Sequence, residues 1–210
     1  MANHNVLILT ALRNEANAIQ TAIPGWKSRK VEFAMIGIRA VRLPDLNTFA
    51  PLRCIILAGL GGALDPSLRI GDVIIDCDAT FPWSTGPLRR ASIHTSSELI
   101  RTSEEKKMLF AHTGAAAVDM EQSIVRAAAL PLNVPFIGIR SISDTAEDAL
   151  DPMILHWIDE VGAPRPVAIV RDLLLRPGSW HAARRLARDS KRALATLGDA
   201  VASMVDEIGS

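Results

Sequence analysis

Short apolar runs alternate along this chain with longer segments in which apolar and polar residues recur at helical spacing. Uninterrupted apolar runs are typical of strands buried on both faces of a sheet, whereas the amphipathic segments favour helices. We predict strands at residues 6–10, 31–36, 53–58, 72–77, 92–95, 115–118 and 136–139. We predict helices at residues 12–23, 102–112, 121–130, 152–160, 166–175 and 179–205. This alternation predicts an α/β fold with helices flanking a mostly parallel sheet.

Turn and cap residues mark several of these boundaries. Pro24-Gly25 ends the first predicted helix, Pro131 ends the third, and Pro177-Gly178 separates the last two. Thr102 and Glu105 have the spacing of a capping box, in which the threonine side chain accepts from a backbone amide and the glutamate reaches back. We therefore expect a helix to begin directly after Thr102.

The composition adds limits on the class of protein. The chain has 210 residues, 49% of them hydrophobic, and no segment has the character of a linker, so we predict a single domain over residues 1–210. The formal net charge is zero, which gives no reason to expect a nucleic-acid partner. The first apolar stretch, Val6–Leu9, is too short for a signal peptide or a membrane span, so we expect a cytoplasmic protein.

Cysteines and histidines suggest no metal chemistry. Cys54 and Cys77 both lie in predicted buried strands, where free thiols are expected rather than a disulfide. The five histidines show no metal-ligand spacing, so we expect no metal site and no cofactor.

Acidic residues stand at the ends of two predicted strands. Asp119 and Glu121 follow the strand at 115–118, and Asp144 closes the strand that begins at residue 136. The carboxyl ends of buried strands are where α/β sheets usually bind ligands. Two such carboxylate-bearing ends predict a site that handles hydroxyls and protons.

Four stretches together resemble the superfamily of nucleoside phosphorylases and nucleosidases. They are the strand and glutamate-bearing turn at 6–16, the glycine-rich run with its following Gly-Asp at 59–75, Val-Asp-Met-Glu at 118–121, and the Val-Pro strand ending in Ile-Ser-Asp at 134–144. The resemblance implies a three-layer α/β/α sandwich with a mixed central sheet. It also implies an enzyme that cleaves the N-glycosidic bond of purine nucleosides, and a homo-oligomer.

The resemblance assigns a role to individual residues. Asp144 matches the acid that serves N7 of the purine, which requires a raised pKa that burial can supply. Ser143 would orient Asp144, Glu121 would accept hydrogen bonds from the ribose, and Met120 would pack against the ribose. Glu15 matches the glutamate that holds the attacking water in the nucleosidases.

Each of these residues also has a purely structural interpretation. Ser143 and Asp144 are good helix or turn caps, and Met120 is equally compatible with the core. Glu15 suits the exposed first turn of a helix. For Asp119 we assign no role and favour a solvated or capping acid.

Two further groups complete the predicted site. Gly59, Gly61 and Gly62 match a glycine-rich turn whose backbone amides would approach the sugar or an anion, although alone they indicate only the end of a strand. The chain has no tyrosine, and Leu99 or Ile100 takes the place of the base-stacking residue of the relatives.

The phosphate ligands of the phosphorylases are missing. Leu57 and Leu60 stand where those enzymes carry an arginine and a serine, and Glu15 adds negative charge nearby. Arg13 and Arg39 are candidates to compensate, but neither sits at a family position. The sequence therefore favours hydrolysis, with phosphate as a co-substrate kept as the alternative.

Residues 102–121 and 176–194 most resemble the hopanoid-associated phosphorylase branch, which implies removal of adenine from adenosylhopane, a lipid-linked nucleoside. The alternatives are a methylthioadenosine/adenosylhomocysteine-type nucleosidase, a soluble purine nucleoside phosphorylase, and a non-catalytic nucleoside-binding protein.

The tail is a basic amphipathic helix, which indicates either peripheral contact with the inner face of the membrane or a packing helix with a solvated basic face. Its apolar side is Ala182, Leu186, Ala193 and Leu197, and its basic residues are Arg184, Arg185, Arg188 and Arg192.

Overall fold

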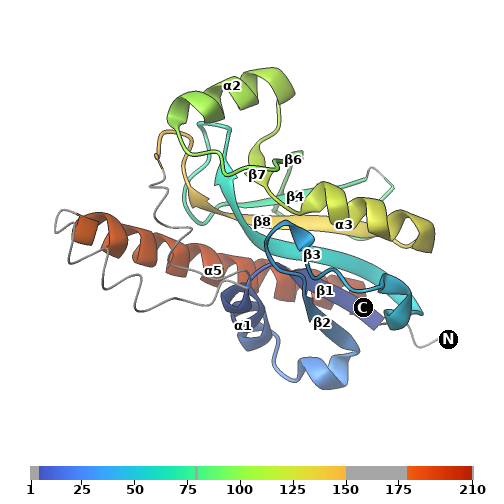
Figure 1. Ribbon diagram of the computed structural model, residues 1–210. Helices are drawn as coiled ribbons and strands as arrows, with labels where there is room; N and C mark the ends of the chain where they lie inside the picture. Colours follow the sequence, from blue (N-terminus) through green and yellow to red (C-terminus); the bar gives the residue numbers. More distant parts are fainter. Residues whose placement is uncertain (1–4, 79, 150–178, 210) are drawn as a thin grey trace.

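The computed structural model describes residues 5–78, 80–149 and 179–209, which form one central sheet with helices on both faces (Figure 1). The strands are β1 Asn5–Thr10, β2 Val31–Met35, β3 Leu52–Ala63, β4 Val73–Cys77, β5 Arg89–Arg90, β6 Ile93–Thr95, β7 Ala117–Asp119 and β8 Phe136–Asp144. The α-helices are α1 Arg13–Ala22, α2 Ser103–Thr113, α3 Gln122–Ala129 and α5 Ser179–Gly209. Short 3-10 turns are η1 Trp26–Arg29, η2 Ile38–Ala40, η3 Leu46–Phe49 and η4 Leu130–Leu132.

The sheet is mixed, with strand order β2-β1-β3-β8-β4-β5. β2, β1, β3 and β8 run parallel, whereas β4 is antiparallel to β8. The end of β3 pairs antiparallel with β7, and β7 pairs with β6. The carboxyl ends of β1, β3 and β8 therefore meet at one edge of the sheet, as the predicted site requires.

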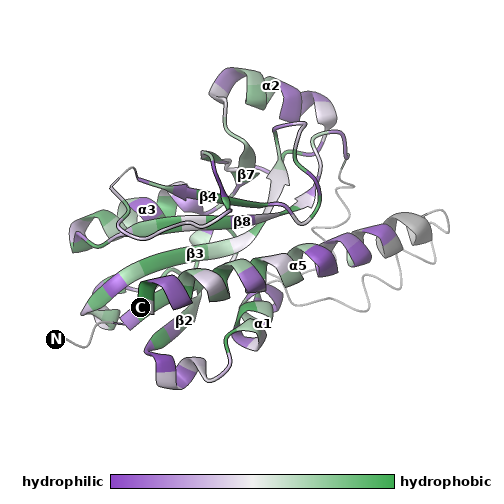
Figure 2. Ribbon diagram, turned by 180° about the vertical axis from the view of Figure 1, so that it is seen from behind, coloured by the Kyte–Doolittle hydropathy of each residue, from purple (hydrophilic) through white to green (hydrophobic). Residues whose placement is uncertain are grey.

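Strand residues alternate between two apolar layers, because successive side chains point to opposite faces. Val6 and Ile8 of β1 pack in the layer that contains α1 and α5, and Leu7 and Leu9 pack in the layer that contains α3. Figure 2 shows the consequence: β3 and β8 are hydrophobic along most of their length, while α5 shows polar segments on its outer side. The predicted three-layer α/β/α sandwich with a mixed sheet is confirmed.

β3 is longer than predicted, and this changes the description of the glycine-rich run. The strand was predicted to end at residue 58, but Gly59, Gly61 and Gly62 are strand residues with partners in β8. Gly62 is also paired with Val118 of β7. The predicted glycine-rich turn is therefore wrong: pairing with β8, and at Gly62 also with β7, keeps these glycines extended despite the low strand propensity of glycine.

The carboxyl-terminal half of α5 is a packing helix. Leu197, Val201 and Val205 are fully or almost fully buried against α1 and the sheet. Gly198 allows α1 to approach so closely that a side-chain carbon at this position would lie 3.0 Å from the carbonyl oxygen of Ala18. The side chains of Ala182, Arg184 and Leu186 lie outside the described residues, as do the helices predicted at 152–160 and 166–175. In the part of the chain that is described, no helix is long and apolar enough to cross a membrane.

Both cysteines are free thiols. Cys54 is fully buried in β3, as predicted, and Cys77 at the end of β4 is only half-buried.

Candidate active site

Glu15 lies in the first turn of α1 with its carboxylate turned into the protein. One carboxylate oxygen accepts from the backbone N–H of Leu60 and the other from that of Leu12, both at 2.9 Å. A side-chain carbon at Gly59 would lie 2.9 Å from Glu15 Oε1, so only glycine leaves room for this carboxylate. Glu15 is 3% exposed, and the interpretation as an exposed first-turn residue is wrong.

Burial gives Glu15 the protonation behaviour of a base that works near neutrality. Loss of water around the charged form raises its pKa from 4.5 to about 7, against the opposing effect of the two amide donors. The positive charge of Arg140 also opposes the rise, and the negative charge of Glu121 adds to it. Glu15, Arg140 and Glu121 therefore share one electrostatic environment.

Asp144 closes β8 and lies beside Gly62 of β3. A side-chain carbon at Gly62 would come within 3.0 Å of Asp144 Oδ2. The register between β3 and β8 shifts by one residue at Ser143, as in a β-bulge, a feature common beside active sites. Ser143 Oγ donates to Asp144 Oδ1 at 2.7 Å, and Lys106 Nζ donates to Oδ2 at 2.6 Å. Asp144 is thus held by one neighbour on each of its two oxygens.

Glu121 occupies the cap position directly before α3 and is almost completely buried. Its Oε1 accepts from the backbone N–H of Arg39 at 2.8 Å, which ties η2 to the start of α3. Burial raises the pKa of Glu121, and the nearby charge of Arg140 opposes that rise. A carboxylate has about four lone-pair sites, so Glu121 can also accept from a ligand hydroxyl.

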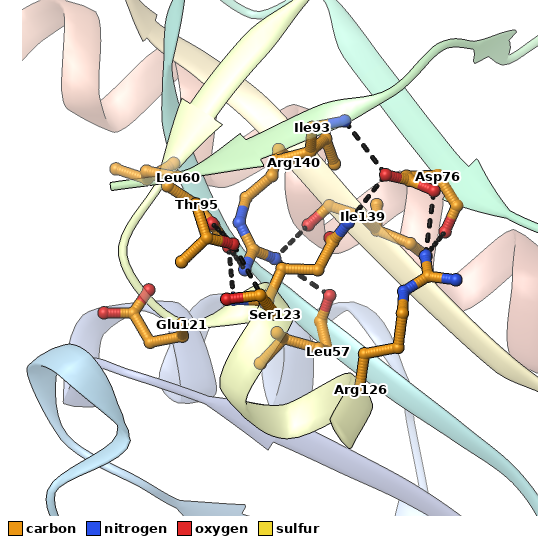
Figure 3. Close-up of polar contacts among 12 residues, drawn as sticks. Leu57, Leu60, Asp76, Ile93, Thr95, Glu121, Ser123, Arg126, Ile139 and Arg140 are labelled. Carbon is orange, nitrogen blue, oxygen red and sulfur yellow. Dashed lines mark hydrogen bonds and ion pairs between the residues drawn. The ribbon is translucent and has the colours of Figure 1, made fainter. Parts of the chain in front are cut away.

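Arg140 is the residue that the sequence analysis missed. It is fully buried within β8 and donates to the carbonyl oxygens of Leu57 at 2.9 Å and Ile139 at 3.0 Å. It also forms an ion pair with Asp119. Figure 3 shows its side chain extending between Thr95 and Leu57, with Glu121 to one side. An arginine inside an otherwise apolar strand was itself a signal, because arginine is almost never fully buried without a partner.

Asp119 is not the solvated acid that we favoured. It is 5% exposed, and Arg140 requires it as a counter-charge. Its carboxylate also accepts from Thr95 Oγ1 at 2.8 Å and from the backbone N–H of Gln122 at 2.9 Å. The capping part of the prediction is therefore correct, since Gln122 opens α3, and the exposure is wrong.

A second polar network fixes the start of α3 against the sheet. Asp76 of β4 accepts from Gln122 Nε2 at 2.7 Å, from Arg126 at 2.8 Å and from the backbone N–H of Ile93 at 2.9 Å (Figure 3). One carboxylate thus joins β4, β6 and α3, which positions Glu121 relative to β8.

β3 is the element that brings the acids together. Glu15 lies over Gly59 and Asp144 lies beside Gly62, three positions further along the strand. Three residues of extended chain span about 10 Å, so both carboxylates lie against the carboxyl-terminal part of β3. Among the described residues, three buried side-chain atoms have no hydrogen-bond partner and so leave polar capacity for a ligand: Thr10 Oγ1, Gln122 Oε1 and Arg140 Nε.

Several predicted residues stay predictions. Met120 is half-buried between Asp119 and Glu121, and Leu99 and Ile100 are half-buried in the segment before α2. Their contacts with ribose and base require a bound ligand to test.

None of the residues named for phosphate places a buried side-chain cation beside Glu15. Leu57 is buried in the core, and Leu60 meets Glu15 through its backbone. Arg13 and Arg39 are exposed, and Arg39 contributes its backbone N–H to Glu121. Within the described ranges, the buried arginine near Glu15 is Arg140, and Asp119 already neutralises it.

The cavity between α5 and residues 84–89 does not contain the three buried carboxylates. A cavity of about 680 Å³ lies between α5 and the segment 84–89, and neither Glu15, Glu121 nor Asp144 lines it. The described residues contain no group of three or more potential metal ligands.

The fold and the buried acids define a class of protein: an α/β/α protein built to bind a small polar ligand at the carboxyl ends of its strands. Comparison with known proteins shows which of them this chain resembles. Residues 84–175 match the family model described as the phosphorylase superfamily. A 5'-methylthioadenosine/S-adenosylhomocysteine nucleosidase from Staphylococcus aureus (strain MRSA252) is 28% identical, over 57% of this chain and 71% of that protein.

Solved structures agree on the fold. A Helicobacter pylori methylthioadenosine/adenosylhomocysteine nucleosidase, solved in complex with a pyrrolidin-3-ol compound, has a TM-score of 0.66 at 18% identity, covering 99% of this chain and 100% of that one. The futalosine hydrolase of Helicobacter pylori has a TM-score of 0.63 at 17% identity, covering 97% and 98%. The family match thus covers residues 84–175, and the similar proteins named here are described as nucleosidases and a hydrolase.

Proposed function

We propose that this protein is a nucleosidase that hydrolyses the N-glycosidic bond of a 5'-substituted adenine nucleoside, of the methylthioadenosine/adenosylhomocysteine type. The similarity to nucleosidases of that type supports this substrate class. It favours the nucleosidase alternative over adenine release from adenosylhopane, the first choice from the sequence. It lends no support to a role in hopanoid synthesis, to membrane contact or to an oligomer.

Three carboxylates divide the work. Asp144 donates a proton to the ring nitrogen of the leaving base while the bond from C1' to the base breaks and its electron pair goes to the base. Glu121 accepts hydrogen bonds from the ribose hydroxyls and stabilises the cationic sugar. Glu15 takes a proton from a water molecule as the water oxygen bonds to C1'.

The observation that carries hydrolysis is the environment of Glu15. A carboxylate with a pKa of about 7 can accept a proton from water near neutrality. The same carboxylate repels phosphate, which needs several cationic or amide donors in a buried site. The amides of Leu60 and Leu12 already donate to Glu15, and Arg140 is paired with Asp119.

The test is product analysis with and without phosphate. The purified protein is incubated with methylthioadenosine, adenosylhomocysteine or adenosylhopane, and free adenine and the sugar product are measured. We expect adenine and free methylthioribose from methylthioadenosine, at a rate that phosphate does not change.

Other results would identify other functions. Strict dependence on phosphate with a ribose 1-phosphate product would show a phosphorylase, and turnover of adenosylhopane alone would restore the first choice from the sequence. Tight binding without turnover would show a nucleoside-binding protein. Glu15→Gln should abolish most turnover, whereas Glu98→Gln, at an exposed position, is the matched control.

A further inference from the structure

Lys106 is a buried lysine directly against Asp144. It lies in the second turn of α2 and is 0% exposed. Its ammonium group donates to Asp144 Oδ2 at 2.6 Å, to the carbonyl oxygen of Thr145 at 2.6 Å and to that of Asp148 at 3.1 Å. Three donors meet three acceptors, so the buried charge is fully hydrogen-bonded.

The packing of α2 against the rest of the protein does not explain why a lysine is buried at this position. Lys106 is the buried residue of a helix that stands at the end of the sheet (Figure 1) and leaves Met108 65% exposed. Burying an ammonium group costs several kcal/mol, and an apolar side chain of similar volume is often as stable. The charge is therefore better explained by what it does to Asp144.

The other charged groups near Asp144 have partners of their own. Among the described residues, Lys106 is the cation that contacts Asp144. Asp148 uses one carboxylate oxygen on the backbone N–H and hydroxyl of Thr145, and the other lies 3.4 Å from Arg185. Arg140, four residues earlier in β8, is paired with Asp119. Glu15 and Glu121 interact with Arg140.

We propose that Lys106 is a positioning residue that stabilises the carboxylate which Asp144 becomes when it gives its proton to the leaving base. This inference rests on the proposed nucleosidase function. The proton moves from the Asp144 carboxyl to the ring nitrogen, the electron pair of the broken bond goes to the base, and Lys106 stays an ammonium ion throughout. The new negative charge forms 2.6 Å from a fixed positive charge, so proton transfer becomes more favourable.

The pH profile of kcat/KM distinguishes this role from a structural one. The profile of an acid–base pair has its optimum midway between the two apparent pKa values. Removing a cation that favours the carboxylate makes Asp144 hold its proton to higher pH. In Lys106→Gln we expect the optimum to move to higher pH and kcat at the optimum to fall about tenfold or more.

Two further variants separate charge from position. Lys106→Arg keeps the charge and should keep the optimum near that of the wild type. Lys107→Gln removes a positive charge from the same helix at an exposed position, and its profile should overlay the wild type. A folded Lys106→Gln protein with a wild-type optimum and kcat would overturn the proposal.

A measurement without substrate covers the case in which Lys106→Gln does not fold. The side-chain ¹⁵N resonance of Lys106, recorded in wild type, should respond to pH through the carboxyl beside it, and that response should vanish in Asp144→Asn. A resonance that is identical in both proteins across the pH range would also overturn the proposal. If the wild type cleaves no nucleoside but this titration is present, the proposed function has failed and the coupling of Lys106 to Asp144 has not.

Discussion

Glu15 couples catalysis to stability, because its pKa in the folded protein, about 7, lies above the ordinary value of 4.5. Between those values the folded state binds more protons than the unfolded state, so stability falls as pH rises. We expect the free energy of unfolding to decrease by roughly 3 kcal/mol from about pH 4.5 to about pH 7 through this residue. Chemical denaturation across that range measures it.

The variant Glu15→Gln should remove most of this slope and be more stable than wild type at pH 8, where the wild-type carboxylate is charged and buried. Glu98→Gln, in an exposed segment, should leave the slope unchanged. If the free energy of unfolding of the wild type did not change between pH 4.5 and 7, Glu15 would not be shielded from water in the way that the structure shows.

Asp144 should be indispensable for turnover. Asp144→Asn keeps the shape and the contact with Ser143 but has no acidic proton, so we expect kcat to fall about 10²–10⁴-fold. Ser143→Ala removes the 2.7 Å hydrogen bond to Asp144 and the 3.3 Å hydrogen bond to the carbonyl oxygen of Gly61, and should have a smaller effect. Steady-state kinetics on methylthioadenosine checks both, and wild-type-like turnover by Asp144→Asn would contradict the assignment.

The sequence analysis selected Glu15, Glu121 and Asp144 because each follows or closes a short apolar run in a recognisable motif; the structure shows that all three are buried, and their roles stay predictions. The sequence was not sufficient for Arg140 and Lys106. The acceptors of Lys106 lie 38 to 42 residues away in the chain, and Leu57, which accepts from Arg140, lies 83 residues away. Those partners are set by the pairing of β3 with β8 and by the position of α2, which local patterns do not contain.

The helices and strands were predicted most closely where the signal is local. The Thr102–Glu105 capping box is present, with hydrogen bonds of 2.9 Å and 3.1 Å, and α2 begins where it was expected. β3 was cut short at residue 58 because glycine disfavours strands. Cross-strand partners decided its length instead, and they also bring Gly59 and Gly62 against the two carboxylates.

The contact between α1 and α5 depends on Gly198. A side chain at this position meets the carbonyl of Ala18 at 3.0 Å and Ala22 Cβ at 3.1 Å. We expect Gly198→Leu to lower the free energy of unfolding by about 1–3 kcal/mol, despite a gain in helix propensity of up to about 1 kcal/mol.

Urea denaturation measures the change. The matched control is Ala195→Leu, which adds the same side chain to an exposed position of the same helix and should be close to neutral. Equal stability of the two variants would show that α1 and α5 do not pack as closely as the structure indicates.

The complete layer on one face of the sheet depends on α5. Its buried residues, including Leu197, Val201 and Ile208, cover β1, β3 and α1. A chain that stops at residue 178 leaves that layer open, so we expect it to bind a hydrophobic dye and to lose its cooperative thermal transition. Adding a peptide of residues 179–210 should restore the transition. A truncated chain that melts cooperatively by itself would contradict this account.

The pairing of the first helix with the last has a consequence for biosynthesis. Residues of α1 leave the ribosome early, but Leu197 and Val201, which cover them, are made more than a hundred and seventy residues later. At about 5–20 residues per second that interval is on the order of ten to thirty seconds. During this time the nascent chain displays Ile19 and Ile23 without their partners. A chaperone that shields apolar segments at the ribosome exit should therefore raise the yield of folded protein, most of all when translation is slow.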